Sequence, residues 1–336
     1  MGAPKELSGL DCDGEDRAGI QLVLRSRLDE MCELRVAALD WSDIEGVHDM
    51  RVASRRLRSA LTDLSPYLRS RAFPKGPLKK IGKALGAVRD EDVAIAALEE
   101  LTSKAEGLSD GIEQITHERR ERQARARTAL EKVITESALD KFREGFLERI
   151  DRLNKAPTEH SVKRKGEPRA GKTYRQIGIE VITDRANHLR NASGSLYHPH
   201  KTKPLHRTRI LAKRLRYAIE LFVPCWGDEL APFTKEAARL QASLGALHDC
   251  DVWIADIGSR LERIDKSKRA QSSPDYRAAC VWLLRYFAKE RAKHYDNALE
   301  RWQQTEEAGF FTRLQTELEL KSNGVESKSA EDPAGS

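Results

Sequence analysis

Two segments of the chain, Val47–Arg58 and Leu205–Arg216, each carry a histidine followed by regularly spaced arginine or lysine residues. A helix turns by about 100° per residue, so it would gather these side chains on one face of each segment. No acid interrupts the first face, and the repulsion between its cations favours an anionic ligand over a surface that serves only solubility. The two sets are His48, Arg51, Arg55 and Arg58, and His206, Arg209, Lys213 and Arg216.

The opposite side of each segment is apolar. The same helical spacing places Met50, Ala53, Leu57, Ala60 and Leu64 there in the first segment, and Leu211, Leu215, Ala218, Ile219 and Phe222 in the second. Apolar stripes of this kind pack against other elements. We therefore expect two helices that each bury one side and present cations on the other.

The elements that must position these faces are predicted from the spacing of apolar residues. Ser42 and Glu45 resemble a capping box that opens the first basic helix, and Pro204 suits the first turn of the second. The chain is therefore predicted to be all-α. The other helices are expected over 20–39, 78–101 with a bend near Gly86, 112–153, 174–196, 230–264 and 275–320.

A second pattern also occurs twice, because Leu85–Val93 is echoed by Leu244–Val252 at almost the same offset as the basic segments. The long helices that follow correspond as well, so each half is expected to form one four-helix unit. Proline, glycine and basic residues between the halves indicate a linker, and both chain ends are polar. The predicted divisions are a first half over 16–154, a basic linker over 155–171, a second half over 172–321, and disordered tails over 1–15 and 322–336.

An arginine interrupts the apolar stripe of the last long helix in each half. These residues are Arg122 and Arg291. A buried guanidinium needs an acid or a ligand, and we favour structural ion pairs. The expected partners are Asp90 or Asp92 in the first half and Asp249 or Asp251 in the second.

The composition favours a helical protein with an acidic partner. The 336 residues are 33% charged, with a net charge of +6 and a pI near 9.0, and this modest excess matters because the cations cluster. No apolar run approaches the roughly 20 residues that span a bilayer, and the N-terminus lacks a signal-peptide pattern. The cysteines show neither metal-finger nor disulfide-framework spacing, which favours a reducing compartment and a cytoplasmic protein. They are Cys12, Cys32, Cys225, Cys250 and Cys280.

The repeated VHxMRVxxRRLR-type helix, followed by LGxxRDxDV, resembles the CHAD family, the conserved histidine α-helical domain. The resemblance covers roughly residues 16–320. It implies two four-helix bundles related by pseudo-twofold symmetry, with basic residues lining a shared groove or cavity. It also implies binding of inorganic polyphosphate and association with polyphosphate granules and their proteins. We expect this binding to be non-enzymatic and to need no cofactor.

The family's basic signature falls on the two basic helices. Lys213 stands where the first half has Arg55, which keeps the charge but loses the planar fork, and His248 replaces Arg89. The resemblance assigns the site to His48, Arg51, Arg55, Arg56, Arg58, His206, Arg209, Lys213, Arg214 and Arg216. Further cations that could extend it are Lys80, Lys83, Arg120, Arg125, Arg239, Lys289 and His294.

Three alternatives compete with this interpretation. The basic faces would also attract nucleic acid, although the aromatic residues follow apolar helical spacings rather than forming a stacking platform. His198, His200 and His206 could form a small metal site, but their neighbours are cationic, and no metal is expected. Glu317–Lys321 matches the ExExK signature of CYTH triphosphatases, which requires a β-barrel strand, so we interpret it as coincidence and expect no enzyme.

Overall fold

The chain is all-α in the computed structural model, which describes residues 5, 7–68, 73, 75–154, 172–266 and 274–329. No helix in that part of the chain is long and apolar enough to cross a membrane. The α-helices are α1 (Asp16–Glu33), α2 (Arg35–Leu39), α3 (Ile44–Leu64), α4 (Lys75–Thr102), α5 (Ser109–Val133), α6 (Glu136–Asn154), α7 (Tyr174–Ala192), α8 (Thr202–Trp226), α9 (Ala231–Lys266), α10 (Pro274–Glu307) and α11 (Phe310–Ser329). Short 3₁₀ turns, η1 (Ser193–Tyr197) and η2 (Gly227–Leu230), flank α8.

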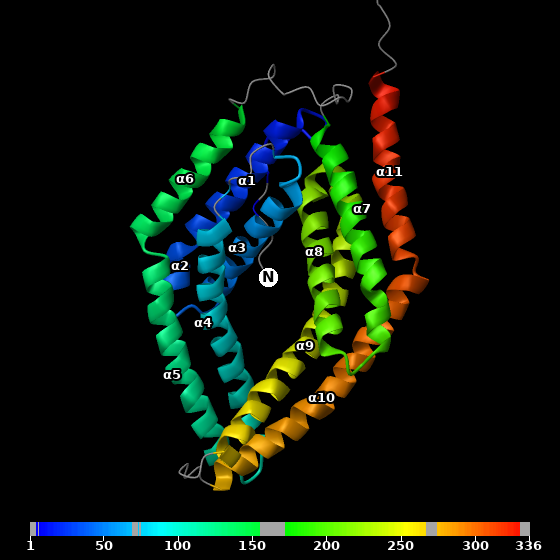
Figure 1. Cartoon of the computed structure of the whole chain (residues 1–336). Helices are drawn as coiled ribbons and strands as arrows, with labels where there is room; N and C mark the ends of the chain where they lie inside the picture. Colours follow the sequence, from blue (N-terminus) through cyan, green and yellow to red (C-terminus); the bar gives the residue numbers. More distant parts are fainter. Residues whose placement is uncertain are drawn as a thin grey trace, which may run out of the picture.

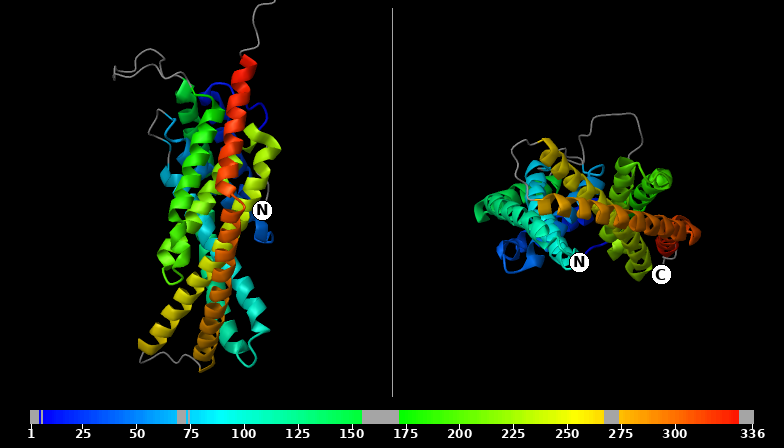
Figure 2. Two further views of the ribbon diagram at one scale, coloured as in Figure 1. Left: turned by 90° about the vertical axis from the view of Figure 1, so that its right-hand side faces the viewer. Right: turned by 90° about the horizontal axis from the view of Figure 1, so that it is seen from below.

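The two halves lie side by side as two arms of helices (Figure 1). In the first half, α1 and α2 are followed by the basic helix α3, the long helix α4 and the pair α5 and α6. In the second half, α7 and η1 are followed by the basic helix α8, the long helix α9 and the pair α10 and α11. This order fits the expected duplication. The basic helices α3 and α8 contact each other, and so do α1 and α7. At the far end α5 packs on α10, so the hairpins of both halves converge there (Figures 1 and 2).

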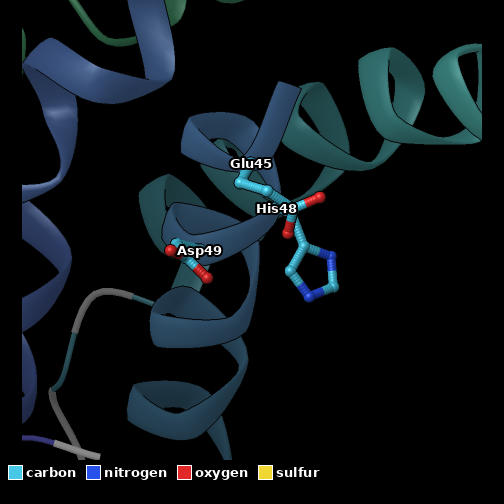
Figure 3. A group of neighbouring side chains, drawn as sticks. All are labelled: Glu45, His48 and Asp49. Carbon is cyan, nitrogen blue, oxygen red and sulfur yellow. The ribbon is translucent and has the colours of Figure 1, made fainter. Parts of the chain in front are cut away.

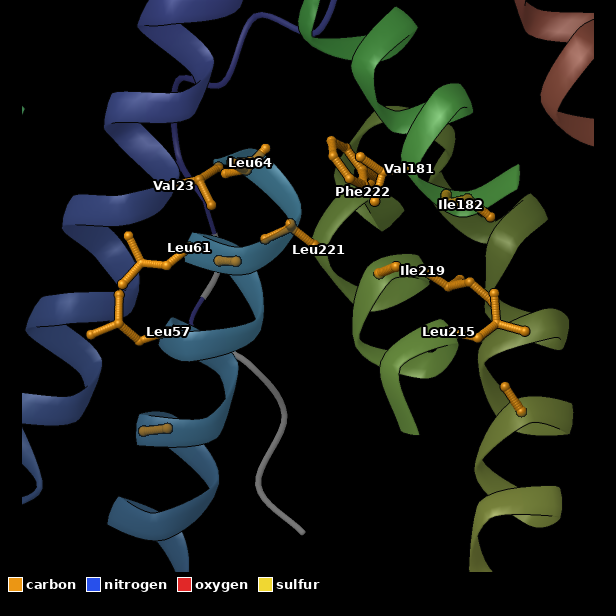
Figure 4. Close-up of a cluster of buried hydrophobic side chains, with 14 of the residues drawn as sticks. Val23, Leu57, Leu61, Leu64, Val181, Ile182, Leu215, Ile219, Leu221 and Phe222 are labelled. Atoms are coloured by element: carbon orange, nitrogen blue, oxygen red, sulfur yellow. The ribbon is translucent and has the colours of Figure 1, made fainter. Parts of the chain in front are cut away.

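Both halves contribute to one large apolar core. Figure 4 shows Leu57 and Leu61 of α3 beside Val23 of α1, while Leu215 of α8 belongs to the layer of the second half. Leu221 lies between these layers and is 5% exposed. All ten residues of the two predicted apolar stripes are buried, so this prediction is confirmed.

A second, smaller core closes the far end of the molecule. It combines Leu98 and Leu101 of α4 and Ile112 of α5 with Ile257 of α9 and Leu283 of α10. Each hairpin tip therefore buries its apolar side chains against the other half. Because burial of apolar surface is the dominant stabilising term, the halves depend on each other here.

Several predicted boundaries need correction. Asp43, not Ser42, caps α3, because its carboxylate accepts from the backbone N–H of Glu45 at 2.9 Å. Helix α4 runs unbroken through Gly86. The helices expected over 112–153 and 275–320 are each two helices, and the second pair is separated by Gly309 at a φ of 62°.

The N-terminal segment, expected to be loose, is fastened to the second half. Cys12 and Cys225 form a disulfide across 213 residues, so the expectation that the cysteines form no disulfide is wrong for this pair. Asp13 accepts two hydrogen bonds from Arg175, at 2.6 and 2.9 Å. The inference of a reducing compartment rested on absent disulfides and loses that basis. The expected linker over 155–171 lies outside the described residues, as do 330–336 of the expected C-terminal tail.

Candidate anion-binding site

The cationic faces of α3 and α8 converge between the two halves. Lys213 of α8 lies among the charges of Arg51, Arg55 and Arg58 of α3 and of Arg209 on its own helix. Burial, followed by these four like charges, lowers the pKa of Lys213 to about 8. We call these five residues the cation cluster.

Glycines beneath the cluster make room for its guanidinium groups. A β-carbon at Gly86 of α4 would lie 3.8 Å from Arg51 Nε, and one at Gly245 of α9 would lie 3.9 Å from Arg209 Nε. The arginines therefore rest against the glycine-containing faces of α4 and α9. From the sequence, Gly86 was expected only to bend its helix and Gly245 was given no role, although their equivalent places in the repeat were a usable signal.

Two carboxylates border the cluster. Asp90 of α4 accepts a hydrogen bond from Arg51 Nη2 at 3.1 Å. Burial raises the pKa of Asp249 of α9, and the nearby Arg209 opposes that rise. Asp90 and Asp249 occupy equivalent places in the repeated motif. Each half therefore places one carboxylate beside an arginine of the cluster.

A pocket of about 370 Å³ opens beside the cluster and is lined by residues of both basic helices. Ion pairing does not neutralise Lys213, which has no carboxylate within salt-bridge distance in the described residues. The lining residues are Arg55, Arg58, Ser59, Thr62, Asp63, Ile210, Lys213, Arg214 and Tyr217. Tyr217, which contacts Arg55 of the other half, was not predicted from the sequence.

The histidines border the cluster but differ from it in charge. His206 Nδ1 lies 3.1 Å from His248 Nδ1. Burial and Arg209 lower the pKa of both rings, that of His248 to about 4. In the first half, burial and Arg89 likewise lower the pKa of His48. These three rings are therefore mainly neutral at pH 7, and the arginines and Lys213 supply the positive charge.

In the described residues, one group of side chains could place three donor atoms on a metal ion. The donor atoms of Glu45, His48 and Asp49 lie within 4.8 Å of one another (Figure 3). Arg89 approaches Glu45 to 3.7 Å and competes for that carboxylate. His206 faces His248 rather than joining His198 and His200 around a common point.

Arg56 and Arg216 do not join the cluster, although both were predicted as site residues. Arg56 Nη1 lies 3.0 Å from Glu30, and Arg216 Nε lies 2.7 Å from Glu220. Their side chains are only 9% and 4% exposed. Because their charges are already paired in this buried ion network, these arginines belong to the contact between the halves.

The predicted secondary cations are spread over the molecule. Arg120 pairs with Glu99 and Glu113, and Arg125 lies 3.7 Å from Glu121. His294 is half-buried near Asp249. No contact in the described residues ties the exposed side chains of Lys80, Lys83, Arg239 and Lys289 to the cluster.

The two arginines of the apolar seams form ion pairs, but only one has an expected partner. Arg291 Nε lies 2.6 Å from Asp251, as predicted. Arg122 approaches Glu91 at 3.7 Å and Asp256 of the other half at 3.9 Å, so the prediction of Asp90 or Asp92 is wrong. The sequence could not reveal Asp256 as a partner, because this contact forms only where the hairpin tips of the two halves cross.

Comparisons with known proteins agree with the fold. The family model described as the CHAD domain matches residues 22–258. The crystal structure of the CHAD domain from the plant Ricinus communis is similar, with a TM-score of 0.67 and 20% identity over 88% of this chain and 95% of that one. PptA from Streptomyces chartreusis is similar with a TM-score of 0.59 and 16% identity, over 86% of this chain and 100% of that one. No curated protein matches.

Proposed function

This chain belongs to the CHAD domain family, and we propose that its cation cluster binds inorganic polyphosphate. The observation that carries the proposal is the convergence of five cations from two distant segments, beside a pocket that Arg55, Arg58 and Lys213 of this cluster line. Like charges held this close destabilise the ligand-free protein, and a polyanion relieves that cost.

A linear phosphate polymer suits the chemistry of this surface. Guanidinium groups donate paired hydrogen bonds to phosphate oxygens, whereas Lys213 acts as a compact point charge. Each unit of the polymer is negative, so several cations can bind one chain. The counterions that the chain releases add a salt-sensitive driving force, as they do for nucleic acids.

The placement of the aromatic residues supports polyphosphate over nucleic acid. Trp253 stacks on Phe287 at 4.7 Å between ring centroids, and Trp282 stacks on Tyr286 at 5.5 Å. Single-stranded nucleic acid is usually held by bases that stack on available aromatic rings. The one aromatic ring that lines the pocket in the described residues, that of Tyr217, is only 5% exposed. A cation cluster without an exposed aromatic platform favours a bare phosphate chain.

We extend the proposal to binding without catalysis. The one carboxylate that lines the pocket in the described residues, Asp63, is 2.7 Å from Arg185, and a general base would need a free carboxylate. The ExExK segment lies in helix α11, where alternate residues do not share a face. Association with polyphosphate granules would follow from binding the polymer that forms them.

A charge-reversal variant tests the proposal. Replacing Arg51, Arg55, Arg209 and Lys213 by Glu should abolish binding of long-chain polyphosphate, measured by titration calorimetry at fixed salt. The matched control reverses four exposed cations elsewhere, Lys104, Arg152, Lys266 and Arg277, which changes the net charge equally. Unchanged affinity in the first variant, with helicity intact by circular dichroism, would refute the site.

Chain length and competition identify the ligand. Long polyphosphate should bind far more tightly than pyrophosphate, because only a polymer can engage cations of both halves at once. DNA at equal phosphate concentration should compete poorly. Equal affinity for every length would point to a small-anion pocket, and efficient competition by DNA would favour nucleic acid.

A further inference from the structure

Tyr217 of α8 joins the two halves through Arg55 of the cation cluster. Its hydroxyl oxygen accepts hydrogen bonds from Arg55 Nε at 3.1 Å and Arg55 Nη2 at 2.7 Å, across 162 residues of sequence. The two donors lie on one edge of the guanidinium. The tyrosine therefore fixes the direction of the fork and leaves Arg55 Nη1 on the side away from it.

The hydroxyl proton of Tyr217 is not used in a hydrogen bond within the described residues. A phenol both donates and accepts, yet in the described part of the chain no acceptor lies within hydrogen-bond distance of its proton. The residue is only 5% exposed, but it lines the 370 Å³ pocket beside Arg58 and Lys213. A buried donor that faces a cationic pocket matches a phosphate oxygen.

The duplication does not supply a second tyrosine. The alignment of the basic helices places Tyr217 opposite Ser59, and Lys213 opposite Arg55. Ser59 also lines the pocket, but its hydroxyl lies 3.3 Å from Asp63. The site thus pairs one arginine held by a tyrosine with one lysine that has no such support.

We propose that Tyr217 is a binding and positioning residue of this site: it orients Arg55 from the other half and donates its hydroxyl proton to a phosphate oxygen. The inference rests on the proposed polyphosphate function. It adds a neutral, directional contact to a site otherwise described by charge. The Arg55–Tyr217 pair would fix the position of one phosphate unit, while Lys213 adapts to its neighbour.

The test compares Tyr217→Phe, Arg55→Ala and the double variant by calorimetry with long-chain polyphosphate. Loss of hydrogen bonds that involve a charged group should make Tyr217→Phe about tenfold weaker. The double variant should lose less than the product of the single losses, because Tyr217 acts partly through Arg55. Tyr67→Phe is the matched control, since that hydroxyl bonds Glu180 at 2.8 Å outside the pocket.

The salt dependence separates this role from a purely structural one. Tyr217→Phe removes no cation, so the slope of log K against log salt should stay unchanged, whereas Arg55→Ala should reduce it by about one counterion. Wild-type affinity in Tyr217→Phe, or fully additive losses, would overturn the inference while leaving polyphosphate binding intact. Failure of the wild type to bind polyphosphate would instead overturn the proposed function.

Discussion

Lys213 is the cation-cluster residue whose charge depends on pH in the accessible range. A guanidinium group is not deprotonated in proteins over this range, so the four neighbouring arginines do not share this dependence. Burial and those arginines lower the pKa of Lys213 to about 8. A bound polyanion would favour the charged form, so the pKa in the complex must be higher than in the free protein.

This difference predicts that polyphosphate affinity falls as the pH rises above 8. Below pH 8 the free protein already holds the proton, whereas above it binding must recover that proton from solution. The loss should approach tenfold per pH unit until the complex itself titrates. Proton uptake can be measured by calorimetry in buffers of different ionisation enthalpy.

Lys213→Arg is the control for this dependence, since it keeps the charge and removes the titration. Its affinity should stay nearly constant between pH 7.5 and about 9.5. The same decline in Lys213→Arg would show that another group titrates. Protonation of His48, His206 and His248, whose pKa values are lowered, can strengthen binding only on the acidic side.

Residue types and helical spacing predicted the residues of the cluster. They did not show which of the predicted basic residues lie outside it. The helical spacing placed Arg51, Arg55, Arg209 and Lys213 on cationic faces, because that geometry depends only on the local sequence. It could not separate Arg216, buried with Glu220, from these residues, because the acid that neutralises it is identified only by packing. Tyr217 was missed since its partner lies in the other half.

At the scale of elements, the glycine faces of α4 and α9 determine how closely the arginines approach. Gly245→Leu should weaken polyphosphate binding about tenfold by displacing Arg209, at a cost of roughly one charge-assisted hydrogen bond. Gly245→Ala should bind normally, because a β-carbon at 3.9 Å from Arg209 Nε is an ordinary contact. Titration calorimetry measures both.

Gly258 on the same helix supplies the matched control. A β-carbon there would have no heavy atom within 4 Å. Gly258→Leu should therefore preserve affinity and, because leucine is the better helix former, should not lower stability. Equal weakening by both leucine variants would indicate a general effect on α9 rather than contact with Arg209.

Helix positions were predicted well, and helix breaks were not. Apolar periodicity continues through the α5–α6 boundary, where Thr135 Oγ1 accepts from the N–H of Ala138 at 3.3 Å. Periodicity reports which side of a helix is buried, not whether the backbone ladder is continuous. The break at Gly309, with its positive φ, had a local signal that a single glycine in a helical pattern could not establish.

On the scale of the whole molecule, the Cys12–Cys225 disulfide closes most of the chain into one covalent loop. Cys225→Ser should lower the free energy of unfolding by about 2–5 kcal/mol, because the unfolded chain regains loop entropy. Guanidinium denaturation of the oxidised proteins measures this change. Cys32→Ser, at an unpaired position, is the control, and equal midpoints for wild type and Cys225→Ser would contradict the prediction.

The repeat predicted the order of the helices, yet not the dependence of one half on the other. Nothing in the spacing of Leu98 or Ile257 indicates that both lie in one core at the crossed hairpin tips. Such contacts are fixed by tertiary packing rather than local preference. The disulfide was missed for the same reason, because two cysteines far apart in sequence give no spacing signal.

The division of the cation cluster between two distant segments also orders events during synthesis. Chains emerge from the ribosome N-terminal end first, so Arg51, Arg55 and Arg58 are exposed before Arg209, Lys213 and Tyr217 exist. The first half then carries its cations before the pocket exists, because that pocket also needs residues of the second half. If the cluster binds polyphosphate as proposed, tight binding must therefore wait until the second basic helix has docked.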